Sequence, residues 1–428
     1  MTASGTLPPF ARRVLGIGSV RRFDYGPPVP VRPLSRRLLL LDPADVRHVL
    51  LGGEAGYRKT PRIASAAGRR RVGSGLISRS GEAHRERRRL LQPLLLRRAV
   101  ERFRGRIAER VEAWTAERRD GERLDLAAAM AGLTRSALLS VLFGDDLTPA
   151  AEARLAEAIQ ARRVYTERLY HGRLPGRDRL PTPVVRAHRR AVRTLDAAVA
   201  EAIARRRAAG GGEDLVALLL AARSAEGEAL TERDVRDEVL TFTSTGYETL
   251  GEALTWAAYL LARHPAVESR LHAALDAGSA DRPDDSPWAD YAGRILDETL
   301  RLYPPTWIFT RVPVAPDRLP SGAAVRPGDT LYVCPWILHR HPGHFPDPER
   351  FDPDRFATDR PERFAYLPFG DGPHRCIGEH LARMEAVLAL GKIGRRLRLR
   401  SLDPRPAEPV GGVTLRPRGG LPVRVELR

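Results

Sequence analysis

The stretch FGDGPHRCIG, residues 369–378, is the most informative segment of this 428-residue chain. It is a glycine-bearing loop that places Cys376 at the expected start of a helix. A helix N-terminus presents free backbone N–H groups and the positive end of the helix dipole, so a sulfur there is favoured as the thiolate. Gly370, Gly372 and Gly378 allow tight turns and a close approach to a flat group. The loop therefore predicts a thiolate iron ligand beside a planar cofactor, a requirement that a haem meets.

The same loop resembles the haem-binding signature of the cytochrome P-450 family, FxxGxxxCxG, with His374 where Arg or His is usual. The resemblance implies haem b as cofactor, Cys376 as the iron ligand, and Phe369, Gly370 and Gly378 as parts of the cofactor loop. An axial thiolate favours cleavage of the O–O bond, whereas a histidine ligand suits reversible oxygen binding. Taken alone, the segment is also compatible with a structural cysteine in a glycine-rich turn. Three further motifs, in the family's order, favour the haem.

Two segments before the loop resemble the structural core of that family. ETLR, residues 298–301, is similar to its ExxR helix, and FDPDRF, residues 351–356, to the segment whose arginine joins it. Glu298 and Arg301 share a helix face and can form a bidentate pair, to which Arg355 is expected to add. An isolated ExxR in so charged a chain is otherwise an ordinary surface pair.

The sequence TGYET, which begins at Thr245, resembles the oxygen-binding groove of the family, commonly Ala-Gly-x-Glu/Asp-Thr-Thr. Gly246 is expected to let the helix pass close to the haem and to O2. Glu248 and Thr249 supply an acid and a hydroxyl that can deliver protons to the bound oxygen. Thr245 replaces the usual Ala, and Leu250 replaces a second Thr. The alternative is a solvated glutamate and a threonine bonded back to its own helix.

The sequence GEAHRERRRLLQP, residues 81–93, resembles the helix that reaches a haem propionate. His84 and Arg88 are one turn apart on one face of this helix. By resemblance, Arg311 and His374 are further propionate partners, so that four donors serve two carboxylates.

The same helix is expected to present a basic surface beside the cysteine loop, made of Arg85, Arg87 and Arg89 with Arg97 and Arg98 nearby. A basic face suits an acidic electron donor. Because no flavin-binding or iron–sulfur segment follows the haem region before Arg428, electrons are expected from separate proteins, a ferredoxin and a ferredoxin reductase.

Substrate contacts are expected, by resemblance, from the loop at 63–76, the segment at 165–183, the groove helix and the segment after PP at 304–305. The residues singled out are Phe242, Thr306, Trp307, Ile308 and Phe309. Their apolar character favours a lipophilic or aromatic small molecule, although the same residues could be ordinary core.

The fold expected from pattern and resemblance is mainly α with a small β region, a triangular helical prism formed by one domain over residues 1–428. A single helix over 231–263, about 50 Å long at 1.5 Å per residue, should run through its centre. Thr231 and Asp234 have the capping-box form that starts a helix, and Pro265 opens the next one. A small sheet should follow Tyr303, and a closing hairpin should turn at 419–420.

Composition and charge argue against several other classes of protein. The net charge of +18 comes almost wholly from arginine interspersed with acids, which argues against nucleic-acid binding. No apolar window of membrane-spanning length is expected, nor a secretory signal, so the cytoplasm is the predicted compartment. Cys334 fits a small buried hydrophobe. The histidines of HRHPGH, residues 339–344, fit scaffold better than a metal site.

The predicted activity is that of a haem-dependent monooxygenase that inserts one atom of O2 into a lipophilic or aromatic small molecule, in bacterial specialised metabolism. Oxidative coupling, desaturation or peroxide-driven oxidation at the same iron stays open, as does a haem-binding sensor without turnover. The sequence does not identify the substrate, the position attacked or the oligomeric state.

Overall fold

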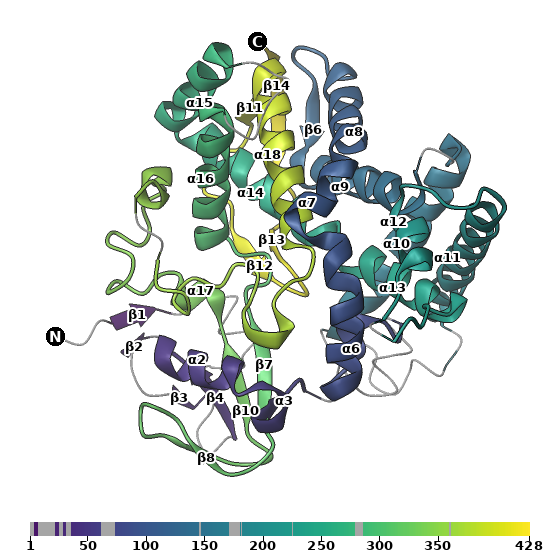
Figure 1. Ribbon diagram of the computed structural model, residues 1–428. Coiled ribbons are helices and arrows are strands. Elements are labelled where there is room, and N and C mark those ends of the chain that lie inside the picture. The colour runs from purple at the N-terminus through teal and green to yellow at the C-terminus, as the bar shows by residue number, and fades with distance from the viewer. Residues whose placement is uncertain are drawn as a thin grey trace.

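The computed structural model describes residues 4–6, 22–24, 29–30, 36–60, 73–144, 147–170, 180, 182–224, 226–278, 286–358 and 361–428. Most of these residues are helical, as Figure 1 shows. The helices are α2 (Pro43–Leu51), α3 (Gly53–Gly56), α6 (Gly81–Leu91), α7 (Arg97–Val100), α8 (Arg104–Ala116), α9 (Leu126–Phe143), α10 (Pro149–Tyr170), α11 (Pro183–Ala208), α12 (Leu215–Ala221), α13 (Glu232–Thr245), α14 (Glu248–Arg263), α15 (Pro265–Ala277), α16 (Pro287–Leu302), α17 (Pro335–Leu338) and α18 (Glu379–Arg396).

The strands are short and form separate groups, with β4 and β10 in the lower part of the view and β6, β11 and β14 near the top (Figure 1). They are β1 (Ser4–Thr6), β2 (Arg22–Asp24), β3 (Val29–Pro30), β4 (Arg37–Leu40), β5 (Tyr57–Arg58), β6 (Arg123–Asp125), β7 (Phe309–Pro313), β8 (Asp317–Arg318), β9 (Ala324–Val325), β10 (Thr330–Val333), β11 (Leu397–Ser401), β12 (Pro409–Gly411), β13 (Leu415–Pro417) and β14 (Pro422–Leu427). The largest sheet has the order β3-β4-β10-β7-β5, with β10 parallel to β4 and antiparallel to β7.

The expected single helix over 231–263 is two helices, α13 and α14, which meet at Gly246 and Tyr247. Both predicted ends are confirmed: Thr231 and Asp234 form a capping box, and Pro265 is the first residue of α15. The interruption follows a run of hydroxyls that bond back to carbonyls one turn earlier, from Thr241, Thr243, Ser244 and Thr245, and the Thr249 hydroxyl does the same just after it. Such back-bonding weakens and bends a helix, which gives the break a local cause.

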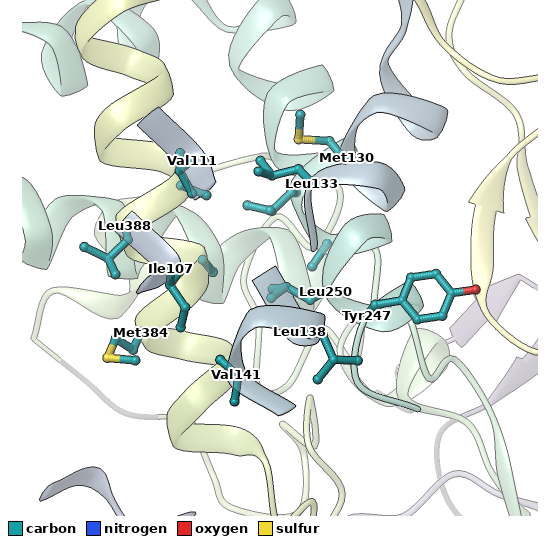
Figure 2. Packing of buried hydrophobic residues seen from close by; sticks show 14 of the residues in the cluster. Ile107, Val111, Met130, Leu133, Leu138, Val141, Tyr247, Leu250, Met384 and Leu388 are labelled. Carbon is teal, nitrogen blue, oxygen red and sulfur yellow. The ribbon is translucent and has the colours of Figure 1, made fainter. Parts of the chain in front are cut away.

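The core lies where α8, α9, α14 and α18 pack together. Figure 2 shows Met384 and Leu388 of α18 close to Ile107 of α8. Leu138 of α9 and Leu250 of α14 belong to the same cluster of buried residues. The break between α13 and α14 therefore lies against the largest hydrophobic cluster of the described residues.

Helix α9 is long and apolar enough to cross a membrane by length and composition, with a mean hydropathy of 1.6. The expectation that no such window occurs is thus wrong. Of this window, 61% is buried inside the protein, against α8 and α14 among others. Its apolar character is accounted for by the core, because a helix that is hydrophobic all round is buried in protein or in lipid.

The strand pairing at the C-terminus also differs from the predicted hairpin. Gly419 and Gly420 do turn the chain, both with positive φ. However, β13 pairs with β12, and β14 pairs with β11 and β6 instead of with β13. The N–H of Leu421 donates to Asp125 Oδ1 at 2.9 Å, which anchors the turn to a distant strand and directs β14 away from β13.

Candidate functional site

The loop that carries Cys376 is a tight, internally bonded turn. The N–H of Cys376 donates to the carbonyl of Phe369 at 2.9 Å, and that of Arg375 donates to Gly372 at 3.0 Å. Gly370 and Gly372 have φ values of 67° and 71°, which glycine adopts without strain. A Cβ on Gly372 would also collide with the Leu50 backbone of α2. These glycines are therefore required by the turn itself.

The cysteine precedes the helix instead of lying within its first turn, because α18 begins at Glu379. Its side chain is solvent-accessible, yet enough protein surrounds it for desolvation to raise the pKa of the thiol. The backbone at Gly378 and the guanidiniums of Arg88 and Arg375 act in the opposite direction. The helix terminus alone therefore does not favour the thiolate as expected; a coordinated metal ion does, because it displaces the thiol proton.

The predicted structural triad is present behind the loop. Arg301 Nε and Nη2 donate to the two oxygens of Glu298 at 2.7 and 2.8 Å, and both side chains are fully buried. Arg355 Nε lies 3.6 Å from Glu298 Oε1 and extends the pair. A buried ion pair of this kind is useful when its remaining donors are satisfied, and Arg301 also donates to three backbone carbonyls.

His339 connects this triad to the cysteine loop. Arg301 Nη1 donates to the His339 carbonyl at 3.1 Å, and His339 Nε2 accepts from the N–H of Leu367 at 2.8 Å. Burial lowers the pKa of His339 to about 3, so the ring is neutral. Since Nε2 accepts, Nδ1 carries the proton and faces the Leu300 carbonyl at 3.2 Å. Within the described residues no three His, Cys, Asp or Glu side chains are grouped to hold a metal ion.

The four expected propionate partners converge, and a fifth basic residue joins them. His84 Nε2 and His374 Nδ1 are 3.1 Å apart, while Arg88 Nη1 donates to the Arg375 carbonyl at 2.6 Å. Burial lowers the pKa of His84 to about 4 and that of His374 to about 2. The next cause in both cases is Lys59, followed by further cationic neighbours that include Arg311. Sequence reasoning missed Lys59, whose rarity in an arginine-rich chain was the available signal.

This donor set fits a haem. Lys59, His84, Arg88, Arg311 and His374 form a partly desolvated basic cluster that two propionate carboxylates would neutralise. In addition, a Cβ built on Gly370 or Gly378 would meet no protein atom within 4 Å, although both residues are partly buried. The backbone on this side of the cysteine loop is thus open to a flat group.

The acid and the alcohol of the groove are both in the first turn of α14, directly after the helix break. Glu248 is 8% exposed, and its Oε1 accepts from Thr414 Oγ1 at 3.1 Å and lies 3.6 Å from Arg163 Nη1. Burial raises the pKa of Glu248. Thr249 Oγ1 donates to the Thr245 carbonyl at 3.0 Å. The glutamate is therefore buried, not solvated. The threonine is hydrogen-bonded back to its own helix, which is what the alternative interpretation predicts for it.

Gly246 is explained by packing. A Cβ at this position would lie 2.8 Å from the Phe242 carbonyl oxygen and 3.3 Å from the methyl carbons of Leu138. The oxygen of the next residue, Tyr247, accepts from Thr134 Oγ1 of α9 at 2.9 Å. The groove is therefore shaped by the close contact of α9 with the break.

The residues expected to form the substrate wall differ in burial. Trp307 is 1% exposed and donates from Nε1 to the Gly412 carbonyl at 3.2 Å, so it belongs to the scaffold and the prediction is wrong there. Phe242, Ile308 and Phe309 are partly buried, and Thr306 is exposed. Most of the loop at 63–76 and about half of the segment at 165–183 lie outside the described residues.

The basic surface also differs from the expectation at one position. Arg87 is 8% exposed because it turns inward to Asp234 and to Glu238, 3.7 Å away. Arg85 and Arg89 are exposed but both pair with Glu82. Arg97 and Arg98, at the start of α7, are exposed as predicted.

The chain was compared with known protein families and with solved structures. A family model described as Cytochrome P450 matches residues 22–421. The chain belongs to the cytochrome P450 family. It is therefore a haem-binding oxidoreductase of the monooxygenase class, and the haem and the reaction class predicted from the cysteine loop are confirmed.

Similar P450 proteins come from Streptomyces. The chain is 35% identical to cyclooctat-9-en-7-ol 5-monooxygenase of Streptomyces melanosporofaciens, over 89% of this chain and 82% of the relative. It is 34% identical to pentalenene oxygenase of Streptomyces avermitilis, over 74% and 72%. The solved haem domain of cytochrome P450DA superposes with a TM-score of 0.77 at 27% identity, covering 92% of this chain and 88% of that one. The predicted fold is confirmed, apart from the divided central helix and the strand pairing after Gly419 and Gly420.

Proposed function

We propose that this P450 oxidises a cyclic terpene or a similar compact hydrophobic molecule in bacterial specialised metabolism. The observation that carries the proposal is the similarity, over most of the chain, to a cyclooctat-9-en-7-ol 5-monooxygenase and a pentalenene oxygenase. The partly buried Phe242, Ile308 and Phe309 supply apolar surface for such a substrate. The protein is proposed to work as one domain in the cytoplasm.

Within the site, Cys376 is proposed to hold the iron, and Lys59, His84, Arg88, Arg311 and His374 to bind the propionates. The haem, when bound, supplies the chemistry that activates O2. Burial raises the pKa of Glu248, which favours transient protonation of its carboxyl, and the Thr249 hydroxyl can pass that proton on after leaving the Thr245 carbonyl. This acid–alcohol pair supports an O2-dependent reaction over a peroxide-driven one. It does not distinguish hydroxylation from oxidative coupling or desaturation, because these reactions use the same proton-delivering residues.

Electrons are proposed to arrive from a ferredoxin and its reductase. The exposed Arg97 and Arg98 lie on α7, which packs against α18, the helix that follows the cysteine loop. A basic surface at this place attracts an acidic donor and brings it near Cys376.

One spectroscopic titration tests both the ligand and the substrate class. The ferric protein is titrated with a panel of cyclic terpene alcohols and hydrocarbons, with planar aromatics as the comparison set, and is then reduced under carbon monoxide. We expect terpenes to shift the ferric spin state at lower concentration than the aromatics, and the reduced complex to show the red-shifted Soret band of a thiolate ligand. Tighter binding of the aromatics would overturn the substrate class, and a Soret band without the red shift would overturn Cys376 as the ligand.

A further inference from the structure

Helix α14 carries a second carboxyl one turn after Glu248. Glu252 is four residues further on, so it shares the same helix face. Its Oε2 is enclosed by protein and has no hydrogen-bond partner in the described part of the chain. Buried oxygens are nearly always hydrogen-bonded, so an orphaned one calls for an explanation.

Charged groups from two other elements face this pair of carboxyls. Helix α10 contributes Arg163 and Glu167, and strand β13 contributes Arg416. Arg416 Nη1 donates to Glu167 Oε1 at 3.0 Å, whereas Arg163 Nη1 lies 3.6 Å from Glu248 Oε1. Three carboxyls thus share two guanidiniums, and full ionisation would leave an excess negative charge inside the protein.

The excess is avoided when one carboxyl keeps a proton, and Glu252 is placed to do so. Burial, followed by the neighbouring Glu248 carboxylate, raises the pKa of Glu252 from 4.5 to about 8. The two arginines oppose this shift without cancelling it. Near neutral pH Glu252 is therefore a carboxylic acid one turn from Glu248.

The cluster also reaches the solvent. The side chains of Arg163 and Arg416 are 29% and 31% exposed, whereas that of Glu248 is 10% exposed. Water at this arginine-lined rim can exchange protons with the cluster, while the Glu248 end lies at the helix break beside Thr249.

We propose that Glu252 is the proton donor that reloads Glu248. The inference rests on the proposed function, in which Glu248 and Thr249 deliver protons. When Glu248 has released its proton, the O–H bond of Glu252 breaks and an O–H bond forms on a Glu248 oxygen, with no change in oxidation state. Glu252 then recovers a proton from water at the rim. Glu252 acts through Glu248 and touches neither substrate nor cofactor.

The first test is the pH dependence of thermal unfolding, which needs no turnover. The folded-state pKa of Glu252 lies above its unfolded value of 4.5. The wild type should therefore lose stability relative to Glu252→Gln between about pH 5 and about pH 8, and no further above that. Glutamine copies the protonated acid, so folding is preserved. A difference in melting temperature that is constant over this range overturns the proposal.

The second test is O2 consumption by the haem-loaded protein without substrate, driven by a plant-type ferredoxin and its reductase. We expect Glu252→Gln to slow consumption about 10-fold at neutral pH, and Glu248→Gln on the order of 100-fold. The decline of the wild-type rate above about pH 8 should disappear in Glu252→Gln. The double variant should be no slower than Glu248→Gln, since Glu252 acts only through it. Glu109→Gln, an exposed site on α8, is the matched control and should keep the wild-type profile.

The results for the two variants distinguish the reloading role of Glu252 from the relay role of Glu248. If Glu248→Gln slows consumption and Glu252→Gln leaves both the rate and its pH profile unchanged, the reloading role is overturned and the proposed relay stands. If Glu248→Gln consumes O2 at the wild-type rate, the relay itself fails and the reloading role fails with it.

Discussion

Lys59 shows how much a single side chain can contribute to a cofactor site. Its ammonium donates to the Ile77 carbonyl at 3.0 Å and stands close enough to His84 and His374 to lower the pKa of both. Cationic neighbours disfavour the protonated imidazolium, so both histidines stay neutral and each can donate to a carboxylate through one ring N–H. The residue follows β5 directly, which brings it from a distant part of the chain to the cysteine loop.

Replacing Lys59 by Gln should weaken haem retention without unfolding the protein. A lost charge-assisted hydrogen bond is worth about 1–2 kcal/mol, which corresponds to a roughly 5- to 30-fold faster haem loss. The measurement is transfer of haem to an excess of apomyoglobin. The exposed neighbour Arg58→Gln removes the same charge on β5 and should lose haem at the wild-type rate; equal effects of the two substitutions would contradict a specific role for Lys59.

At the scale of elements, α16 and α18 hold the structural triad and the cysteine loop together. Gly391 of α18 lies directly against Trp288 of α16, and a Cβ there would come within 2.8 Å of the indole Cη2. Gly293, in the middle of α16, faces open space in which a Cβ would meet nothing within 4 Å. The two glycines have the same intrinsic cost in a helix and differ only in packing.

The Gly391→Ala variant should therefore be destabilised by about 1–3 kcal/mol, because the buried indole must move. Gly293→Ala should instead be stabilised by roughly 0.5–1 kcal/mol, because alanine costs less backbone entropy in a helix. Midpoints of urea unfolding report both changes. A stabilised Gly391→Ala variant would show that α16 and α18 do not pack as closely as described.

At the scale of the whole molecule, the net charge of +18 is spread over many arginines that already have acidic partners. Arg85 and Arg89 both pair with Glu82, and Arg87 is buried. The effective positive surface near the cysteine loop is therefore smaller than the sequence indicates, and Arg97 and Arg98 carry much of it.

Reversing both charges in Arg97→Glu/Arg98→Glu should slow ferredoxin-supported turnover at low salt by about 10-fold or more. The deficit should shrink as added salt screens the surface, because the Debye length falls to about 8 Å near 0.15 M. The matched control is Arg189→Glu/Arg190→Glu, an adjacent exposed pair on α11. Equal losses in the two double variants would remove the proposed docking face.

Features encoded by contiguous motifs are determined by the sequence alone. The cysteine loop, the Glu298–Arg301 pair and the Thr231 cap are each encoded by residues within one or two turns of one another. Over such distances the backbone geometry is known in advance, so residue type and spacing define the chemistry. The haem, the reaction class and the mainly helical fold could be predicted for this reason.

Tertiary structure decided what depends on contacts between distant segments. The sequence predicts a substrate-facing Trp307 and an exposed Arg87. Both side chains turn inward instead, because Trp307 donates to the Gly412 carbonyl and Arg87 pairs with Asp234. Lys59 had no motif, and only packing places it beside the propionate cluster. Glu252 follows Glu248 by one helical turn, but only packing buries it and so raises its pKa. Burial and neighbouring charge set the pKa of a side chain, and neither is a property of local sequence.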